Sequence, residues 1–365
     1  MVLKLAIPES FDEQKRGLLI EQVSYVTPGI TSVTIEQDDL LISFQVGMEQ
    51  VESYLQAQFQ TIVNKIADYK SIPVRTLKTH YAAAPEQSVS LSRDHTSVDP
   101  SAYQLLDELF LGIARKHNAI ERRYPTLLPK QVMHTCGYHT NFPQNVYAVA
   151  EIPHQFDVLE SAHRHMDTVF QKSAYYLQPC ICYHVYEELY GQQVSGVRLY
   201  TAEGRCFRHE AKWRLNAFRR NEFSMREIVM IGTSSDITEI RQRIIDDVWE
   251  LFVRLGLQGT VQTANDPFFT SDGLDKLTFQ LLSSAKYELI AQCGSHSSAI
   301  SSFNHSGDVI ARKFQITGAE GESVYTGCVG FGIDRWIQAL CHRHGDDVRN
   351  WPLALQQGET AIAAF

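Results

Sequence analysis

A basic stretch near the middle of this 365-residue chain carries side chains suited to binding an anion. Between Arg205 and Glu227 the sequence has seven basic residues and three acidic ones, although the formal net charge of the whole chain is −9. A local group of cations in an acidic chain indicates an anionic ligand rather than a generally adhesive surface. The basic residues of this stretch are Arg205, Arg208, Lys212, Arg214, Arg219, Arg220 and Arg226.

Four residues extend this pattern toward a nucleotide triphosphate. Arg208 and Glu210 stand two residues apart, so on a strand their side chains would point to the same face. The arginine can then bind phosphate through its planar fork, and the carboxylate can orient it or accept from an amino group. Phe223 can stack on adenine, and Arg335, which follows a Gly-Phe-Gly turn, can hold the far end of a triphosphate. The alternative for Arg208 and Glu210 is a surface salt bridge.

Composition excludes several classes of protein. A hydrophobic content of 44% and a charged content of 21% are ordinary for a globular chain. No apolar run reaches about 18 residues, so we expect no membrane span, and the N-terminal apolar segment is too short for a signal peptide. We therefore expect a cytoplasmic protein. Its acidic balance disfavours extended contact with nucleic acid, and seven scattered cysteines are not typical of a disulfide framework.

The elements that position these residues divide into two predicted units. Residues 1–70 are expected to form a small α+β domain, with strands at 30–36 and 40–46 and a helix over 48–69. Residues 71–100, rich in Pro, Ser and Ala with weak periodicity, are expected to be a linker.

Residues 101–365 are expected to form the catalytic domain. Apolar periodicity predicts helices over 101–117, 157–176 and 236–255. Apolar runs rich in β-formers predict strands at 227–232, 276–282 and 287–291. Because strands outnumber helices without regular alternation, we expect an α+β fold with a mixed or antiparallel sheet and flanking helices.

The order of these motifs resembles the catalytic domain of the class II aminoacyl-tRNA synthetases. Residues 207–210 (Phe-Arg-His-Glu) match the start of that family's second motif, and residues 330–335 (Gly-Phe-Gly-Ile-Asp-Arg) match its third. Residues 124–129, after an amphipathic helix, are similar to its first motif, which in that class lies at a dimer interface. The resemblance covers roughly residues 101–355. It implies the class II antiparallel sheet flanked by helices, and a homodimer.

Within that class the chain is most similar to the seryl-tRNA synthetases, through the spacing of Arg219, Phe223 and Glu227 and through residues 285–289 and 300–304. The resemblance implies that Arg208 holds the α-phosphate or the substrate carboxylate, and that Arg335 holds the γ-phosphate. The acid that the family has before its Ser-Ser pair is Ala299 here, so that position offers no carboxylate for Mg²⁺. The ATP-binding residues that the resemblance implies, including Glu322 as a ligand of Mg²⁺, are Arg208, Glu210, Arg219, Phe223, Ser302, Glu322 and Arg335.

A zinc-dependent branch of that family suggests a metal at the amino-acid pocket. There a glutamate and two cysteines bind Zn²⁺, and Glu227, Cys182 and Cys328 match their positions. Three protein ligands leave one tetrahedral position for a substrate amine. Cys180 is the nearest rival of Cys182, and a buried cysteine can also serve packing alone.

The proportions of the chain resemble the truncated seryl-synthetase homologues called amino acid:[carrier protein] ligases. The resemblance implies that a small amino acid is activated with ATP to an aminoacyl-adenylate and passed to the phosphopantetheine thiol of a carrier protein. Arg208, Glu227 and Arg335 would then be the catalytic residues, and no tRNA is expected because residues 1–100 carry no sustained heptads or basic stripe. The alternatives are a seryl-type tRNA synthetase and a non-catalytic paralogue that binds or regulates.

Overall fold

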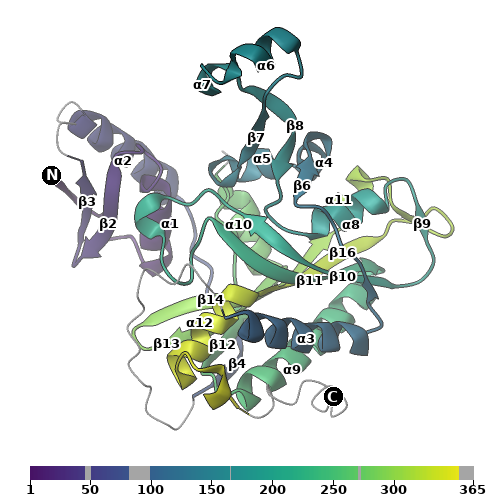
Figure 1. Ribbon diagram of the computed structural model, residues 1–365. Coiled ribbons are helices and arrows are strands. Elements are labelled where there is room, and N and C mark those ends of the chain that lie inside the picture. The colour runs from purple at the N-terminus through teal and green to yellow at the C-terminus, as the bar shows by residue number, and fades with distance from the viewer. Residues whose placement is uncertain (46–50, 82–98, 165, 270–272, 353–365) are drawn as a thin grey trace.

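The computed structural model describes residues 1–45, 51–81, 99–164, 166–269 and 273–352. Its centre is an eight-stranded sheet of order β4-β12-β13-β14-β16-β11-β10-β5 (Figure 1). Every neighbouring pair is antiparallel apart from β10 and β5. This confirms the α+β class and the predicted antiparallel sheet. The strands are β4 (Thr76–His80), β5 (Ile120–Glu121), β10 (Arg198–Phe207), β11 (Glu222–Gly232), β12 (Gly259–Thr263), β13 (Lys286–Cys293), β14 (His296–Gly307) and β16 (Tyr325–Gly332).

One face of this sheet is covered by three long helices, α3 (Pro100–Lys116), α9 (Ser234–Arg254) and α12 (Ile333–His344) (Figure 1). The helices predicted at 101–117 and 236–255 are therefore confirmed. Thr233 and Asp236 form a capping box at the start of α9, which satisfies backbone N–H groups of its first turn. Along β11, Ile228 and Met230 pack into the core beneath these helices, as the period of two in a strand requires.

The opposite face of the sheet packs against a second core, to which Val229 and Ile231 of the same strand contribute. Short helices and a three-stranded sheet of order β6-β8-β7 lie on this side. These elements are β6 (Leu127–Pro129), α4 (Lys130–Cys136), α5 (Tyr138–Asn141), β7 (Ala148–Glu151), β8 (Gln171–Leu177), α8 (Cys182–Glu188), β9 (Gln193–Val194), α11 (Val309–Lys313) and β15 (Thr317–Gly318).

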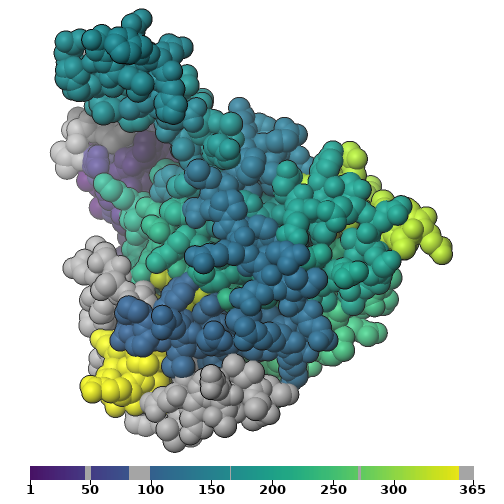
Figure 2. Space-filling view, turned by 45° about the vertical axis from the view of Figure 1, so that its right-hand side comes forward, coloured from purple at the N-terminus to yellow at the C-terminus, as the bar shows by residue number. Residues whose placement is uncertain are grey.

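Helices α6 (Phe156–Ala162) and α7 (Met166–Val169) form a lobe that stands clear of the body, at the top of Figures 1 and 2. The single helix predicted over 157–176 is wrong. The chain leaves α7 and enters β8, where the side chains alternate in a sheet instead of following one helix face.

The strand predicted at 276–282 is also wrong, because this segment lies in helix α10 (Gly273–Leu282). Its β-forming residues suggested a strand, but Leu274, Leu277 and Leu281 recur at helical spacing and pack in one apolar cluster. The tertiary contact decides the structure over local propensity.

The N-terminal residues form a three-stranded sheet of order β1-β3-β2 with its own apolar core. The predicted strand–turn–strand is confirmed, and the predicted helix is α2, although residues 46–50 lie outside the described part. Within the expected linker, β4 joins the large sheet by pairing with β12, and residues 82–98 lie outside the described ranges. The elements of this unit are β1 (Val2–Ala6), α1 (Glu13–Val23), β2 (Ile30–Glu36), β3 (Asp39–Phe44) and α2 (Val51–Ala67).

Across the described ranges, no helix has the length and apolar character needed to cross a bilayer.

Candidate active site

A cavity of about 1140 Å³ lies on the sheet face opposite α3, α9 and α12, and nearly all of the predicted site residues line it. Its floor is made by three neighbouring strands. Gly330 of β16 lies between Glu227 of β11 and Ser302 of β14, which are its cross-strand partners. A Cβ at Gly330 would stand 3.3 Å from the Ser302 hydroxyl oxygen, so glycine keeps the floor open between the two polar side chains.

Three arginines, Arg208, Arg219 and Arg335, converge on one side of this cavity. The guanidinium of Arg335 donates to two backbone carbonyls, those of Phe218 (2.7 Å) and Ala299 (2.8 Å). Burial, together with the nearby charges of Arg208 and Arg219, lowers the pKa of Arg335 to about 10. Within the described residues, neither Arg208 nor Arg335 forms an ion pair with a carboxylate. This side of the cavity therefore carries positive charge that an anionic ligand would neutralise.

Phe223 lies beside these cations on the cavity wall. The guanidinium of Arg208 stands over its ring, 5.2 Å from the centroid, at cation–π distance. The ring and the guanidinium are thus held next to each other, as stacking on a base and binding of the adjoining phosphates require.

Glu210 also lines the cavity, but it does not orient Arg208 as the two-residue spacing predicted. Strand β10 ends at Phe207, so the alternation of side chains no longer applies to residues 208–210. The Glu210 carboxylate instead accepts from Arg219 (3.1 Å). The alternative of a surface salt bridge between Arg208 and Glu210 is wrong as well.

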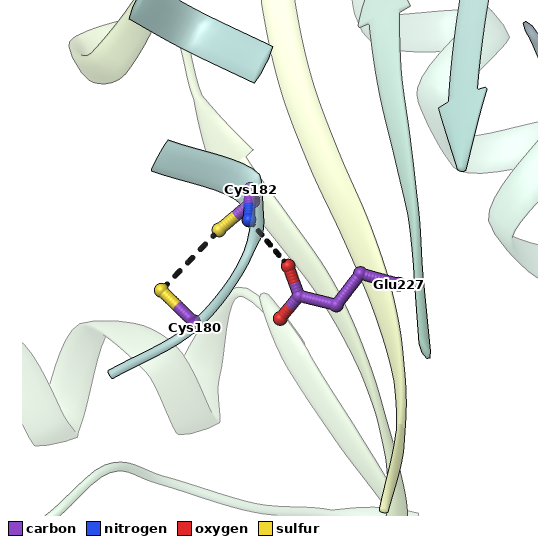
Figure 3. A group of neighbouring side chains, drawn as sticks. All are labelled: Cys180, Cys182 and Glu227. Atoms are coloured by element: carbon purple, nitrogen blue, oxygen red, sulfur yellow. Dashed lines mark hydrogen bonds between the residues drawn. The ribbon is translucent and has the colours of Figure 1, made fainter. Parts of the chain in front are cut away.

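In the same cavity, the thiols of Cys180 and Cys182 lie beside the carboxylate of Glu227 (Figure 3). Ligand atoms of Cys180, Cys182 and Glu227 all lie within 4.8 Å of one another. The two sulfurs are 3.6 Å apart, and the backbone N–H of Cys182 donates to Glu227 Oε2 (2.6 Å). Cys328, in β16, accepts from the Asn304 amide (3.5 Å) and lies outside the group formed by Cys180, Cys182 and Glu227. In the sequence Cys180 is a rival of Cys182 for this site, whereas the structure places both thiols in the group.

The donors of this group suit zinc, which prefers thiolate and carboxylate ligands. Burial raises the pKa of the Glu227 carboxyl, against the opposing effect of the hydrogen bond from Cys182. The pKa of Cys182 is raised by its neighbours Cys180 and Cys328 and by burial. Metal ligands bind in their deprotonated, negatively charged forms. A cation within the group would therefore offset the repulsion between these charges and the cost of burying them.

A family model described as the tRNA synthetase class II core domain (G, H, P, S and T) matches residues 166–344. Those residues form a class II tRNA synthetase core domain.

Two curated proteins are similar to a larger part of the chain. The amino acid–[acyl-carrier-protein] ligase 1 of Bradyrhizobium diazoefficiens is 29% identical over 276 residues, which cover 72% of this chain and 84% of that protein. The type-2 serine–tRNA ligase of Methanopyrus kandleri is 26% identical over 275 residues, which cover 68% of this chain and 52% of that protein. The chain thus spans about half the length of the second relative and most of the first.

A solved structure of M. kandleri seryl-tRNA synthetase with a tRNA from A. aeolicus has the same fold, with a TM-score of 0.64 at 19% identity. The superposition covers 98% of this chain and 77% of that one.

One predicted residue of the class II core does not reach the cavity. Glu322 lies on the turn before β16, where its carboxylate folds back and accepts from the backbone N–H of Glu320 (2.9 Å). The family resemblance implied that it is a ligand of Mg²⁺, but the turn directs its carboxylate away from the cavity.

Further charged residues, for which the sequence suggested no role, also line the cavity; among them Asp266, Lys286 and Glu288 lie next to one another. The Lys286 ammonium lies 2.5 Å from Asp266 and 2.9 Å from Glu288. Glu288 is the cross-strand partner of Ser302, which brings a carboxylate next to that hydroxyl. The signal in the sequence was the spacing of Lys286 and Glu288, two residues apart in a strand and hence on one face.

Proposed function

We propose that this protein activates a small amino acid with ATP and transfers it to the phosphopantetheine thiol of a carrier protein. The observation that carries the proposal is the cavity itself. It is lined by Arg208 and Arg335, which form no ion pair within the described residues, and by the thiol–carboxylate group of Cys180, Cys182 and Glu227. The match to a carrier-protein ligase over 84% of that protein's length supports the same activity.

In the first step the amino acid's carboxylate oxygen attacks the α-phosphorus of ATP, and pyrophosphate leaves. Arg208 would stabilise the charge that develops at the α-phosphate, while Phe223 holds the adenine and Arg335 the γ-phosphate. Arg219, oriented by Glu210, would contact the nucleotide from the loop between β10 and β11. Such a step depends on positioning and on neutralising charge in a dry cavity rather than on a side-chain nucleophile.

ATP binds as its magnesium complex in this class of reaction, and the cavity offers a carboxylate for the ion. Glu288 and Ser302 are neighbours across β13 and β14, and both line the cavity. We therefore assign Mg²⁺ to these two residues in place of Glu322.

We assign the amino group of the substrate to the end of the cavity that holds Glu227. Cys182, Glu227 and Cys328 would hold a zinc ion there, with Cys180 directly beside them. Bound zinc would supply a Lewis-acid site that favours a free amine over a hydroxyl. The thiols and the carboxylate fix one end of the amino acid, so that its carboxylate is directed toward the arginines.

In the second step the thiol sulfur attacks the acyl carbon of the adenylate. A thioester bond forms, AMP leaves, and the thiol proton passes to solvent. Neutral, compact substrates suit the end of the cavity at Glu227, and one methylene there would change affinity by about 1–3 kcal/mol.

Exchange of radiolabelled pyrophosphate into ATP tests the activation step, with a panel of amino acids and a control without amino acid. We expect exchange with one or a few small amino acids. If none supports exchange, the activation step is refuted and a non-catalytic paralogue becomes the better interpretation.

The acceptor is tested separately, by offering a holo carrier protein and total tRNA to the activated enzyme. We expect a thioester on the carrier, detected as a mass increase that hydroxylamine removes. Loading of tRNA without loading of the carrier would favour the seryl-type synthetase instead.

We also propose a homodimer, because residues 124–129 resemble the motif that lies at the dimer interface in this class. Light scattering on the purified protein should give a mass near twice 41.5 kDa. A mass of one chain at every concentration would contradict the dimer.

A further inference from the structure

The wall of the cavity is not built by the class II core alone. Four residues of helix α1, in the N-terminal unit, line it: Gln14, Gly17, Leu18 and Glu21. They follow one another at intervals of three, one and three residues, so they share one face of the helix. That face of the N-terminal unit therefore belongs to the cavity.

Several contacts fix α1 in this position. Arg214, on the loop that carries Arg219, forms an ion pair with Glu21 at 2.6 Å. The rings of Tyr25 and Phe269 meet edge to face, with centroids 5.7 Å apart. Each contact joins the N-terminal unit to a segment that lines the cavity. These contacts hold α1 against the cavity as one of its walls.

Leu18 adds an apolar contact to this wall. It packs against the small cluster that contains Tyr69, Leu277 and Leu281, and thereby joins α1 to α10.

Gly17 keeps this wall open. A Cβ built on it would have no heavy atom within 4 Å, so the glycine is not required by close packing. Glycine in a helix interior costs about 1 kcal/mol relative to alanine, and its backbone here is not in the left-handed region. An unfavourable residue without a local structural need points to a use for the space beside it.

The chemistry of this wall differs from that of the arginine side. The cavity-lining residues that the N-terminal unit supplies include one acid, already paired with Arg214, and no base; they are Gln14, Gly17, Leu18, Glu21, Tyr25 and Tyr69. A nucleic-acid strand needs cations along its phosphates, and this wall has none to offer. A slim, uncharged chain of amide and methylene groups fits it.

We propose that α1 forms one wall of the passage through which the pantetheine arm brings its thiol to the adenylate. The inference rests on the proposed function and adds the site of the acceptor, which lies between the N-terminal unit and the arginine end of the cavity. The large volume, about 1140 Å³, is at the upper end of ordinary ligand sites and leaves room for a second substrate.

The test is Gly17→Trp, which fills the passage from an open helix position. Ala57→Trp is the matched control, because Ala57 is an exposed small residue of α2 in the same unit and does not line the cavity. The probes are pyrophosphate exchange for activation and thioester formation on free pantetheine, followed by mass spectrometry. Gly17→Ala, which adds only a methyl group, controls for loss of the glycine itself.

We expect Gly17→Trp to keep exchange within about twofold of the parent while transfer to pantetheine falls at least about tenfold, the scale of 1.4 kcal/mol. Ala57→Trp and Gly17→Ala should change neither rate. If transfer by Gly17→Trp is unchanged, or if exchange and transfer fall equally, the proposal that α1 lines the passage is wrong.

Two further outcomes bear on the acceptor. Reduced loading of tRNA by Gly17→Trp, with no transfer to pantetheine by the parent, would assign the passage to a nucleotide and overturn the proposal. Absence of exchange in the parent protein would instead refute the proposed function, so the two failures are distinguishable.

Discussion

Arginines lie on both sides of the large sheet, and their charges are balanced differently on the two sides. On the helix-covered face, Arg226 is 3% exposed and binds both carboxylate oxygens of Asp107 in α3, at 2.6 and 2.8 Å. On the cavity side, Arg208, which follows β10, and Arg335 of α12 form no ion pair with a carboxylate in the part of the chain that the structure describes; they interact with backbone carbonyls and with the Phe223 ring. An arginine thus stabilises the fold where its charge is paired with a carboxylate. It is available to bind an anionic ligand where its charge has no such partner.

The cost of the second arrangement is visible at Arg335, whose pKa falls to about 10 through burial and repulsion from its neighbours. A folded protein keeps such a group when a ligand supplies the missing charge, because perturbed groups gather at functional sites. The comparison therefore predicts that substitutions on the two faces fail in different ways.

The largest effect on stability is expected on the paired face. Arg226→Met removes one partner of a buried, two-pronged ion pair and leaves Asp107 without its cation. Breaking such a pair costs about 3–5 kcal/mol, which urea unfolding would measure. Arg198→Met, at an exposed position of β10, should stay within about 0.5 kcal/mol of the parent. Equal stabilities for the two variants would contradict a structural role for Arg226.

The largest effect on activity is expected on the cavity face. Arg208→Met removes a cation that forms no ion pair within the described residues; its guanidinium stands over the Phe223 ring and donates to the Pro179 carbonyl at 3.3 Å. Loss of one preorganised charge of this kind lowers a rate by about 10²–10³-fold. Pyrophosphate exchange should show that fall, while the midpoint of urea unfolding stays near that of the parent. If Arg208→Met loses stability as well as activity, Arg208 has a structural role like that of Arg226, and the proposed difference between the two arginines is wrong.

The contrast between paired and unpaired charges can also be tested by varying the pH at Lys286. This residue lines the cavity, yet it is paired with carboxylates. Burial alone would raise the pKa of Asp266, but the Lys286 ion pair and hydrogen bonds from Lys286 and Gln280 lower it below 3.8. In the parent this contributes stability above the unfolded pKa, which is lost as the pH falls through the folded value. In Lys286→Met, burial dominates and raises that pKa, so the carboxylate destabilises the fold at neutral pH.

We therefore expect Lys286→Met to lose about 1.5–3 kcal/mol at pH 7.5 and to recover part of it at pH 5.5, as Asp266 takes up a proton. Thermal unfolding at the two pH values measures the slope, and Lys286→Arg should behave like the parent. A melting temperature of Lys286→Met that falls with acidification would show that the pairing does not control the titration.

Local pattern was enough to predict the parts of this fold that have a single period. The helices α3 and α9 repeat apolar residues at helical spacing, and β11 has a continuous run of apolar β-formers, so these elements are evident from the sequence. Helix α10 could not be predicted in this way, because its residues include β-formers. The packing of Leu277 and Leu281 against Tyr69 favours the helix instead.

The site shows the same limit. Residues on long strands, such as Glu227 and Ser302, reach the cavity because their strand register places them there. Glu210 and Glu322 lie on turns, whose direction depends on tertiary contacts, and both were assigned contacts that they do not make. The cavity wall formed by α1 was unpredictable for the same reason, since it depends on how two units meet.

The smallest expected effect concerns the thiols beside Glu227. Here a zinc ligand must be distinguished from a cysteine that only lies next to the metal site. Cys182 and Glu227 belong to either possible zinc site, and the third ligand is Cys328 or Cys180. We expect Cys328→Ser to lose zinc from the purified protein.

Cys180→Ser, in contrast, should keep about one zinc per chain and weaken it by about 10–100-fold, as substitution beside a metal site does. Metal analysis and competition with a chelator measure both quantities. Cys206→Ser is the control, because this thiol is fully buried but lies outside the group of Cys180, Cys182 and Glu227. If Cys180→Ser loses the ion while Cys328→Ser keeps it, Cys180 is the ligand, as the 3.6 Å between its sulfur and that of Cys182 would allow.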